Sequence, residues 1–94
     1  MTPAELRESL AGAAPPDGID GPLAALWWAG KGDWNKAHEV AQADDGKAAA
    51  WVHAHLHRIE GDLDNAGYWY RRAGRPRSEA PLPEEWDEIA AALL

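Results

Sequence analysis

Residues 56–73 read LHRIEGDLDNAGYWYRRA, and they give the clearest indication of secondary structure in the chain. It predicts one helix, a tight turn at Gly61 and Asp62, and a second helix that ends near Ala73. Glycine permits the tight turn, and the aspartate can cap the helix that follows it. A shorter copy of the turn, GDWNKA at residues 32–37, lies 29 residues earlier. Two helix-turn-helix units at a fixed spacing indicate an α-helical repeat.

The rest of the chain continues the helical pattern, and no segment predicts a strand. A capping box at Thr2 and Glu5 opens an N-terminal helix, and the last helix is predicted to begin at Glu84. Stretches rich in Pro and Gly separate these helices from the central units. We therefore expect one all-α domain over residues 1–94, with the N-terminal helix in 1–13, the two helix-turn-helix units in 23–73 and the C-terminal helix in 83–94.

The periodicity of apolar residues predicts which side chains are buried. On the helix expected over 47–60, the shared apolar face carries Ala48, Val52, Leu56 and Ile59. Neighbouring aromatic residues cannot all face one core, because consecutive helical positions diverge by about 100°. We therefore expect Trp28 or Tyr68 to lie on the surface, where such residues often anchor an interface.

The composition excludes several classes of protein. Ninety-four residues make one small domain, and six Trp with no Phe supply its large aromatic side chains. The absence of Cys excludes disulfides and thiolate metal sites. The net charge of −7 argues against nucleic acid and anionic membranes as partners. The chain has no run of about 20 apolar residues and does not start like a signal peptide, so we expect a cytoplasmic protein.

The turn Gly-Asp-x-x-x-Ala, found at 32–37 and 61–66, resembles the helix junction of tetratricopeptide repeats. The segment AGYWYRRA at 66–73 is similar to the second helix of SEL-like repeats. Over roughly 23–73 this resemblance implies antiparallel helix pairs in a right-handed array, with a groove that commonly binds protein segments. The whole chain also resembles short uncharacterised bacterial proteins, which implies no particular activity.

The leading functional hypothesis is a non-enzymatic module for protein–protein interaction. Its predicted groove lies where the helices over 47–60 and 63–73 meet, and its expected partner-binding residues are His57, Glu60, Asn65, Tyr68, Trp69 and Arg72. No catalytic residues or cofactor are predicted. The pair Glu84 and Glu85 is interpreted as a helix cap or a solvated face rather than as an acid/base couple. A third hypothesis is an obligate homodimer with no outside ligand.

The alternative hypothesis is a metal or small-ligand site at His53, His57 and Glu60. His53 and His57 are four residues apart on a predicted helix, so both imidazoles project from one side, and Glu60 follows about one turn later. His55 points away from that side, and the sequence does not fix a third histidine ligand. The structural interpretation of the same residues is half-buried histidines that are hydrogen-bonded to backbone or carboxylate groups.

Overall fold

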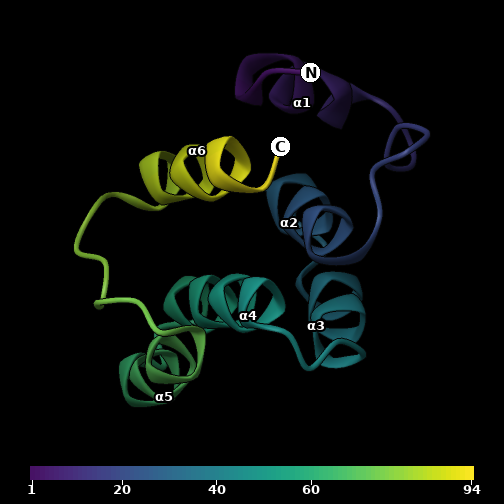
Figure 1. Cartoon of the computed structure of the whole chain (residues 1–94). Coiled ribbons are helices and arrows are strands. Elements are labelled where there is room, and N and C mark those ends of the chain that lie inside the picture. The colour runs from purple at the N-terminus through teal and green to yellow at the C-terminus, as the bar shows by residue number, and fades with distance from the viewer.

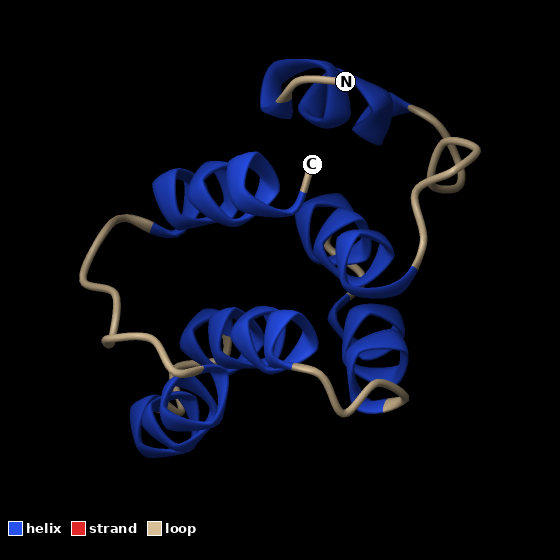
Figure 2. Cartoon of the chain, viewed as in Figure 1, coloured by secondary structure: helices blue, strands red, loops and turns tan.

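The computed structural model describes all residues from 1 to 94 and contains helices but no strands (Figures 1 and 2). This confirms the predicted all-α class. The elements are α1 (Pro3–Glu8), a short 3-10 helix (Ser9–Ala11), α2 (Gly21–Lys31), α3 (Trp34–Gln42), α4 (Lys47–Ile59), α5 (Leu63–Ala73) and α6 (Leu82–Leu93). None of these helices combines the length and the apolar character needed to cross a membrane.

The helix starts follow the local chemistry of the sequence. The capping box of α1 is formed, because the Glu5 amide donates to Thr2 Oγ1 at 3.1 Å and the Thr2 amide donates to Glu5 Oε1 at 2.9 Å. Helix α6 begins at Leu82, two residues before the predicted start at Glu84. Pro83 is accommodated there because the first turn of a helix needs no amide donor from that position.

The two predicted turns have nearly the same backbone conformation. Gly32 and Gly61 are left-handed, with φ of 88° and 82°. Asp33 and Asp62 follow with ψ of 80° and 79°, and each side chain accepts a hydrogen bond from the amide three residues later. The turns join α2 to α3 and α4 to α5. The sequence duplication is therefore a structural duplication of the turns, while the right-handed stacking of the pairs stays a prediction.

Helix α4 lies at the centre of the molecule. It contacts α2, α3, α5 and α6, and Figure 1 shows it between α5 on one side and α6 on the other. As a result, all nine residues of Ala49–His57 are buried. The prediction for Ile59 was wrong: it is 40% exposed because α4 ends there. Polar side chains in the buried stretch must find hydrogen-bond partners inside the protein.

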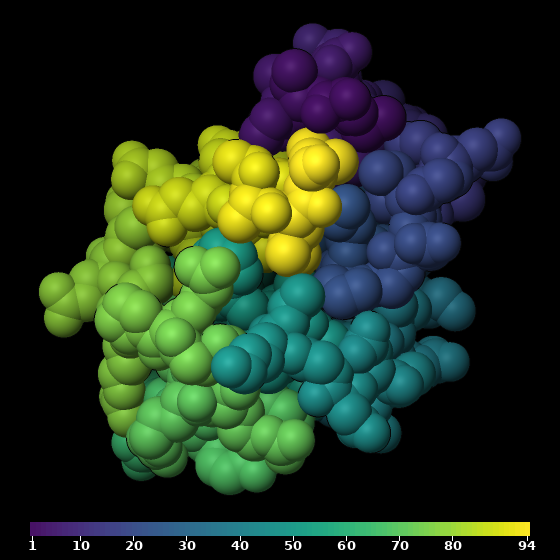
Figure 3. All heavy atoms as spheres, in the orientation of Figure 1, coloured from purple at the N-terminus to yellow at the C-terminus, as the bar shows by residue number.

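Tryptophan side chains tie distant helices together. The Trp27 indole is fully buried and donates to Ser9 Oγ at 2.9 Å. The Trp86 indole donates from α6 to the carbonyl of Leu26 in α2 at 2.8 Å. Trp28 is half-buried and packs edge-on against Trp27. Figure 3 shows α1 seated against α6, which agrees with their contacts and closes the two ends of the chain onto one another.

Candidate functional site

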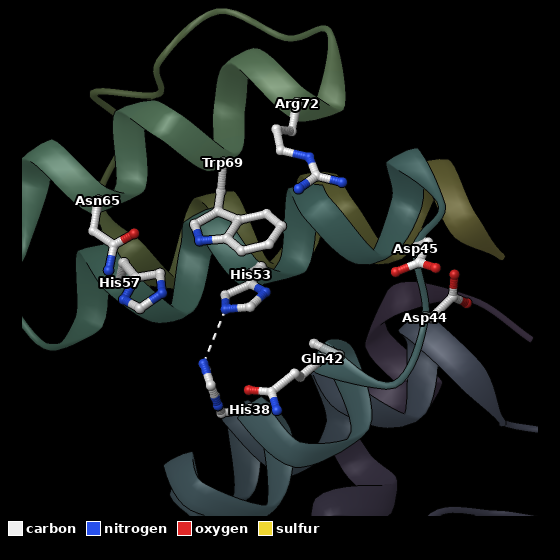
Figure 4. Close-up of a pocket in the computed structure, with 10 residues that line it drawn as sticks. His38, Gln42, Asp44, Asp45, His53, His57, Asn65, Trp69 and Arg72 are labelled. Carbon is white, nitrogen blue, oxygen red and sulfur yellow. Dashed lines mark hydrogen bonds between the residues drawn. The ribbon is translucent and has the colours of Figure 1, made fainter.

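A pocket of about 310 Å³ lies between α3, α4 and α5 (Figure 4). Its lining is mainly polar and comes from these three helices and from the turn between α3 and α4. The residues are His38, Ala41, Gln42, Asp44, Asp45, His53, His57, Asn65, Trp69 and Arg72. The volume is at the small end of the range for ligand sites, so the pocket suits a small molecule or an ion.

Three imidazoles converge at this pocket. His38 comes from α3, and His53 and His57 come from successive turns of α4. The Nε2 atoms of His38 and His53 are 2.9 Å apart and share a hydrogen bond, drawn as the dashed line in Figure 4. One potential ligand nitrogen from each histidine lies within 4.8 Å of the other two. Side chains from two helix pairs thus meet at one point.

The orientation of His57 is fixed by Glu60. Nδ1 of His57 donates to Glu60 Oε1 at 2.5 Å, across the last turn of α4. Because the carboxylate holds the proton on Nδ1, the lone pair of this imidazole is on Nε2. Metal-binding histidines commonly have this outer carboxylate partner. Glu60, expected as a ligand beside His53 and His57, bonds to Nδ1 of His57, and His38 supplies the third imidazole of the cluster.

Two tryptophans hold the other imidazole rings in place. Trp69 stacks on His53 with 3.8 Å between ring centroids and an interplanar angle of 8°. Trp34 stacks on His38 at 4.8 Å and 11°, and its indole donates to the carbonyl of Leu56 at 2.7 Å. These stacking contacts hold the orientation of both rings.

The environment of His38 and His53 favours their neutral form. Burial, with the nearby His38, His57 and Arg72, lowers the pKa of His53 to about 4. Burial also lowers the pKa of His38, and the neighbouring His57 adds to this effect. The neutral imidazole is the form that binds metal ions, so His38 and His53 need not lose a proton at neutral pH to do so.

Two other walls of the pocket carry charged side chains. Arg72 is exposed and lies over the Trp69 ring, with Cζ 5.1 Å from the ring centroid. It donates from Nη1 to the Tyr68 hydroxyl at 3.2 Å and forms no ion pair. Asp44 and Asp45 lie in the turn after α3, and Asp44 accepts from the Gly46 amide at 2.7 Å.

The residues predicted for a partner-binding groove are only partly brought together. His57, Asn65, Trp69 and Arg72 all line the pocket. Tyr68 does not line it and is 44% exposed, which confirms that one of the two aromatics expected at the surface lies there. The sequence did not identify His38. The one local pattern that involves His38 is its position four residues after Trp34, and the two rings stack in the structure.

A second polar cluster corrects the interpretation of Glu85 as a cap or a solvated residue. Glu85 is fully buried, and its Oε1 accepts from His55 Nδ1 at 2.7 Å and from Arg58 Nη1 at 2.8 Å. Its Oε2 accepts from the Tyr70 hydroxyl. Burial alone would raise the pKa of Glu85, but these hydrogen bonds outweigh it and the pKa is lowered. The cluster joins α4, α5 and α6.

Comparisons of the chain with protein-family models, curated proteins and solved structures return no significant match. Its function is therefore inferred from its own residues.

Proposed function

We propose that this protein binds a divalent transition-metal ion, best fitted by Zn²⁺, through His38, His53 and His57. The observation that supports this is the convergence of three imidazoles with ligand atoms within 4.8 Å of one another. Three protein ligands with a fourth position left for water or a ligand are typical of open zinc sites. The pocket next to the histidines leaves room for that fourth ligand.

The metal-free geometry is close to what coordination needs. With Zn–N bonds of about 2.0–2.1 Å in a tetrahedron, ligand nitrogens lie roughly 3.3–3.4 Å apart. The Nε2 atoms of His38 and His53 are 2.9 Å apart, so the pair has to open by only a few tenths of an ångström. His38 is half-buried on α3 and can make that adjustment by a small side-chain rotation. For both Nε2 atoms to bind an ion, the imidazole that donates this hydrogen bond would hold its proton on Nδ1 instead of Nε2, so no proton would have to be released.

The ligand chemistry favours a transition metal over Mg²⁺ or Ca²⁺. Imidazole nitrogens suit Zn²⁺, Cu²⁺ and Ni²⁺, whereas Mg²⁺ and Ca²⁺ prefer oxygen ligands. Three neutral ligands leave the full charge of the ion in place. Glu60 offsets part of it through His57, and Asp44 and Asp45 lie on the same pocket.

Calorimetric titration of the protein with Zn²⁺ tests the proposal. We expect one saturable site, weakened about 100-fold or more in His38→Gln. Structural zinc sites with four ligands are worth about 10–16 kcal/mol, or roughly 3 kcal/mol per ligand. Glu39→Gln, the next residue along α3 and outside the pocket, is the control and should bind as the unaltered protein does. Equal affinity in His38→Gln, or no saturable heat at micromolar protein, would refute the proposal.

The second candidate is a protein-interaction module of the tetratricopeptide type. The duplicated turns at Gly32 and Gly61 and the exposed Tyr68 favour it. A tagged protein should then capture a partner that the double variant Tyr68→Ala/Arg72→Ala loses while keeping its helical circular dichroism. A partner captured equally well by the double variant would contradict the predicted groove.

A further inference from the structure

Opposite charges line the pocket without meeting. Arg72 lies on one wall, from α5, and Asp44 and Asp45 lie on another, from the turn after α3. Figure 4 shows the guanidinium and the two carboxylates around the same opening. No ion pair joins them, although all three side chains are exposed and charged. A molecule that carries both charges would satisfy both walls at once.

His53, a buried residue, presents one polar atom to the same opening. Its side chain is almost completely buried and its Nε2 is bonded to His38, but its Nδ1 has no hydrogen-bond partner in the protein. That nitrogen is not sealed from solvent, and Figure 4 shows it on the side of the ring toward Arg72 and Gln42. By contrast, Nδ1 of His57 has the carboxylate of Glu60. No side chain of the protein bonds to Nδ1 of His53 in the way that Glu60 bonds to Nδ1 of His57.

We infer that this pocket binds a small zwitterion, of the size of a free amino acid, between Arg72 and the carboxylates of Asp44 and Asp45. The ligand's carboxylate accepts from the Arg72 guanidinium and from Nδ1 of His53, and its ammonium group pairs with the aspartates. The volume of about 310 Å³ admits a ligand of this size. The two aspartates disfavour a dianion such as phosphate, and Arg72 disfavours an organic cation that has no carboxylate to pair with it.

The inferred site adds to the proposed metal site and does not require it. In the metal-free protein, His53 can carry its single proton on either nitrogen. A metal on Nε2 places the proton on Nδ1, where it can be donated to the ligand's carboxylate. One added hydrogen bond strengthens binding about 2- to 10-fold. By linkage, the zwitterion then strengthens metal binding by the same factor.

The test is an NMR titration of the metal-free protein, read from the indole N–H of Trp69. The probes are glycine, β-alanine and 4-aminobutyrate, whose two charges are progressively further apart, with acetate and ethylammonium as probes that carry one charge. We expect saturable shifts with at least one zwitterion, and binding about 10-fold weaker or worse for both single-charge probes. No saturation with any of the three zwitterions, or equal binding of acetate, would overturn the inference.

Two arginine variants and a Zn²⁺ titration distinguish failure of the zwitterion site from failure of the proposed metal site. Arg72→Ala should weaken the best zwitterion about 10-fold or more. Arg71→Ala removes the same charge from the neighbouring exposed residue outside the pocket and should leave binding unchanged. Equal binding by Arg72→Ala would overturn the zwitterion site while leaving any zinc affinity intact. Failure to bind Zn²⁺ would remove the metal site, and the zwitterion titration would still stand by itself.

Discussion

Replacing Glu85 by Ala is the most direct test of the structure, because it removes the centre of the buried cluster. The carboxylate accepts hydrogen bonds from His55, Arg58 and Tyr70. Without it, the Arg58 guanidinium, whose side chain is only 14% exposed, keeps a single acceptor, the carbonyl of Ala80. A buried charge loses its counterion, and two further donors lose their acceptors.

The expected loss is a large part of the total stability. Breaking a buried ion pair by removing one partner costs about 3–5 kcal/mol. A chain of this length has roughly 5–14 kcal/mol in all, at about 0.05–0.15 kcal/mol per residue. For a domain of this size each kcal/mol lowers Tm by about 4–8 °C, so Glu85→Ala should lower Tm by roughly 12–40 °C.

Thermal unfolding followed by circular dichroism measures this effect, and Glu84→Ala is the matched control. Glu84 is the neighbouring residue in the first turn of α6, and it is exposed. Removing its favourable interaction with the helix dipole should cost less than about 1 kcal/mol. If the two variants melt at similar temperatures, Glu85 does not hold α6 to α4 and α5 as described.

Four further predictions rest on the same structure. Hydrogen bonds hold the pKa of Glu85 in the folded protein below 4.5. Its contribution to stability is therefore complete above pH 4.5 and is lost as the pH falls through the lower folded-state pKa. In a pH series, the free energy of unfolding should fall less steeply at acid pH in E85Q than in the unaltered protein. Burial and the bond to Glu85 raise the pKa of Tyr70 above 10.0, so stability should fall as the pH rises past about 10, and less steeply in Tyr70→Phe. Gly32→Ala, at φ 88°, should cost about 1–2 kcal/mol in a urea titration, with little change in helical content. Zn²⁺ at 100 times its Kd should stabilise the protein by about 2.7 kcal/mol and raise its Tm by roughly 10–20 °C. The same Zn²⁺ concentration should leave the Tm of His38→Gln nearly unchanged.

The sequence was sufficient for the helices and the turns because their signals are local. A glycine that must be left-handed and an aspartate that caps the next helix stand side by side at Gly61 and Asp62. The capping box at Thr2 is equally local. The start of α6 was placed one to two residues late because the prolines before it indicate a break, whereas proline is tolerated in a first helical turn.

The two polar clusters depend on contacts between helices, which no local pattern specifies. Glu85 was grouped with Glu84 because two acidic residues at a helix start suit its dipole. The spacing held a different signal, since Glu85 lies one turn before the buried Ile89 and therefore on the core face of α6. His38 joins His53 and His57 only because α3 packs against α4. That contact joins the second helix of one pair to the first helix of the next.

The position of the histidines between the two helix pairs would let the proposed metal site form without holding the fold together. The core residues and the Glu85 cluster hold α4, α5 and α6 together away from the pocket. Within the pocket, His38 and His53 form a hydrogen bond with each other. Small zinc domains that lack such a core unfold without metal, and their binding energy is used for folding. If the proposal is right, an ion would only have to separate two imidazoles that already face each other, so the energy of coordination would be available for affinity.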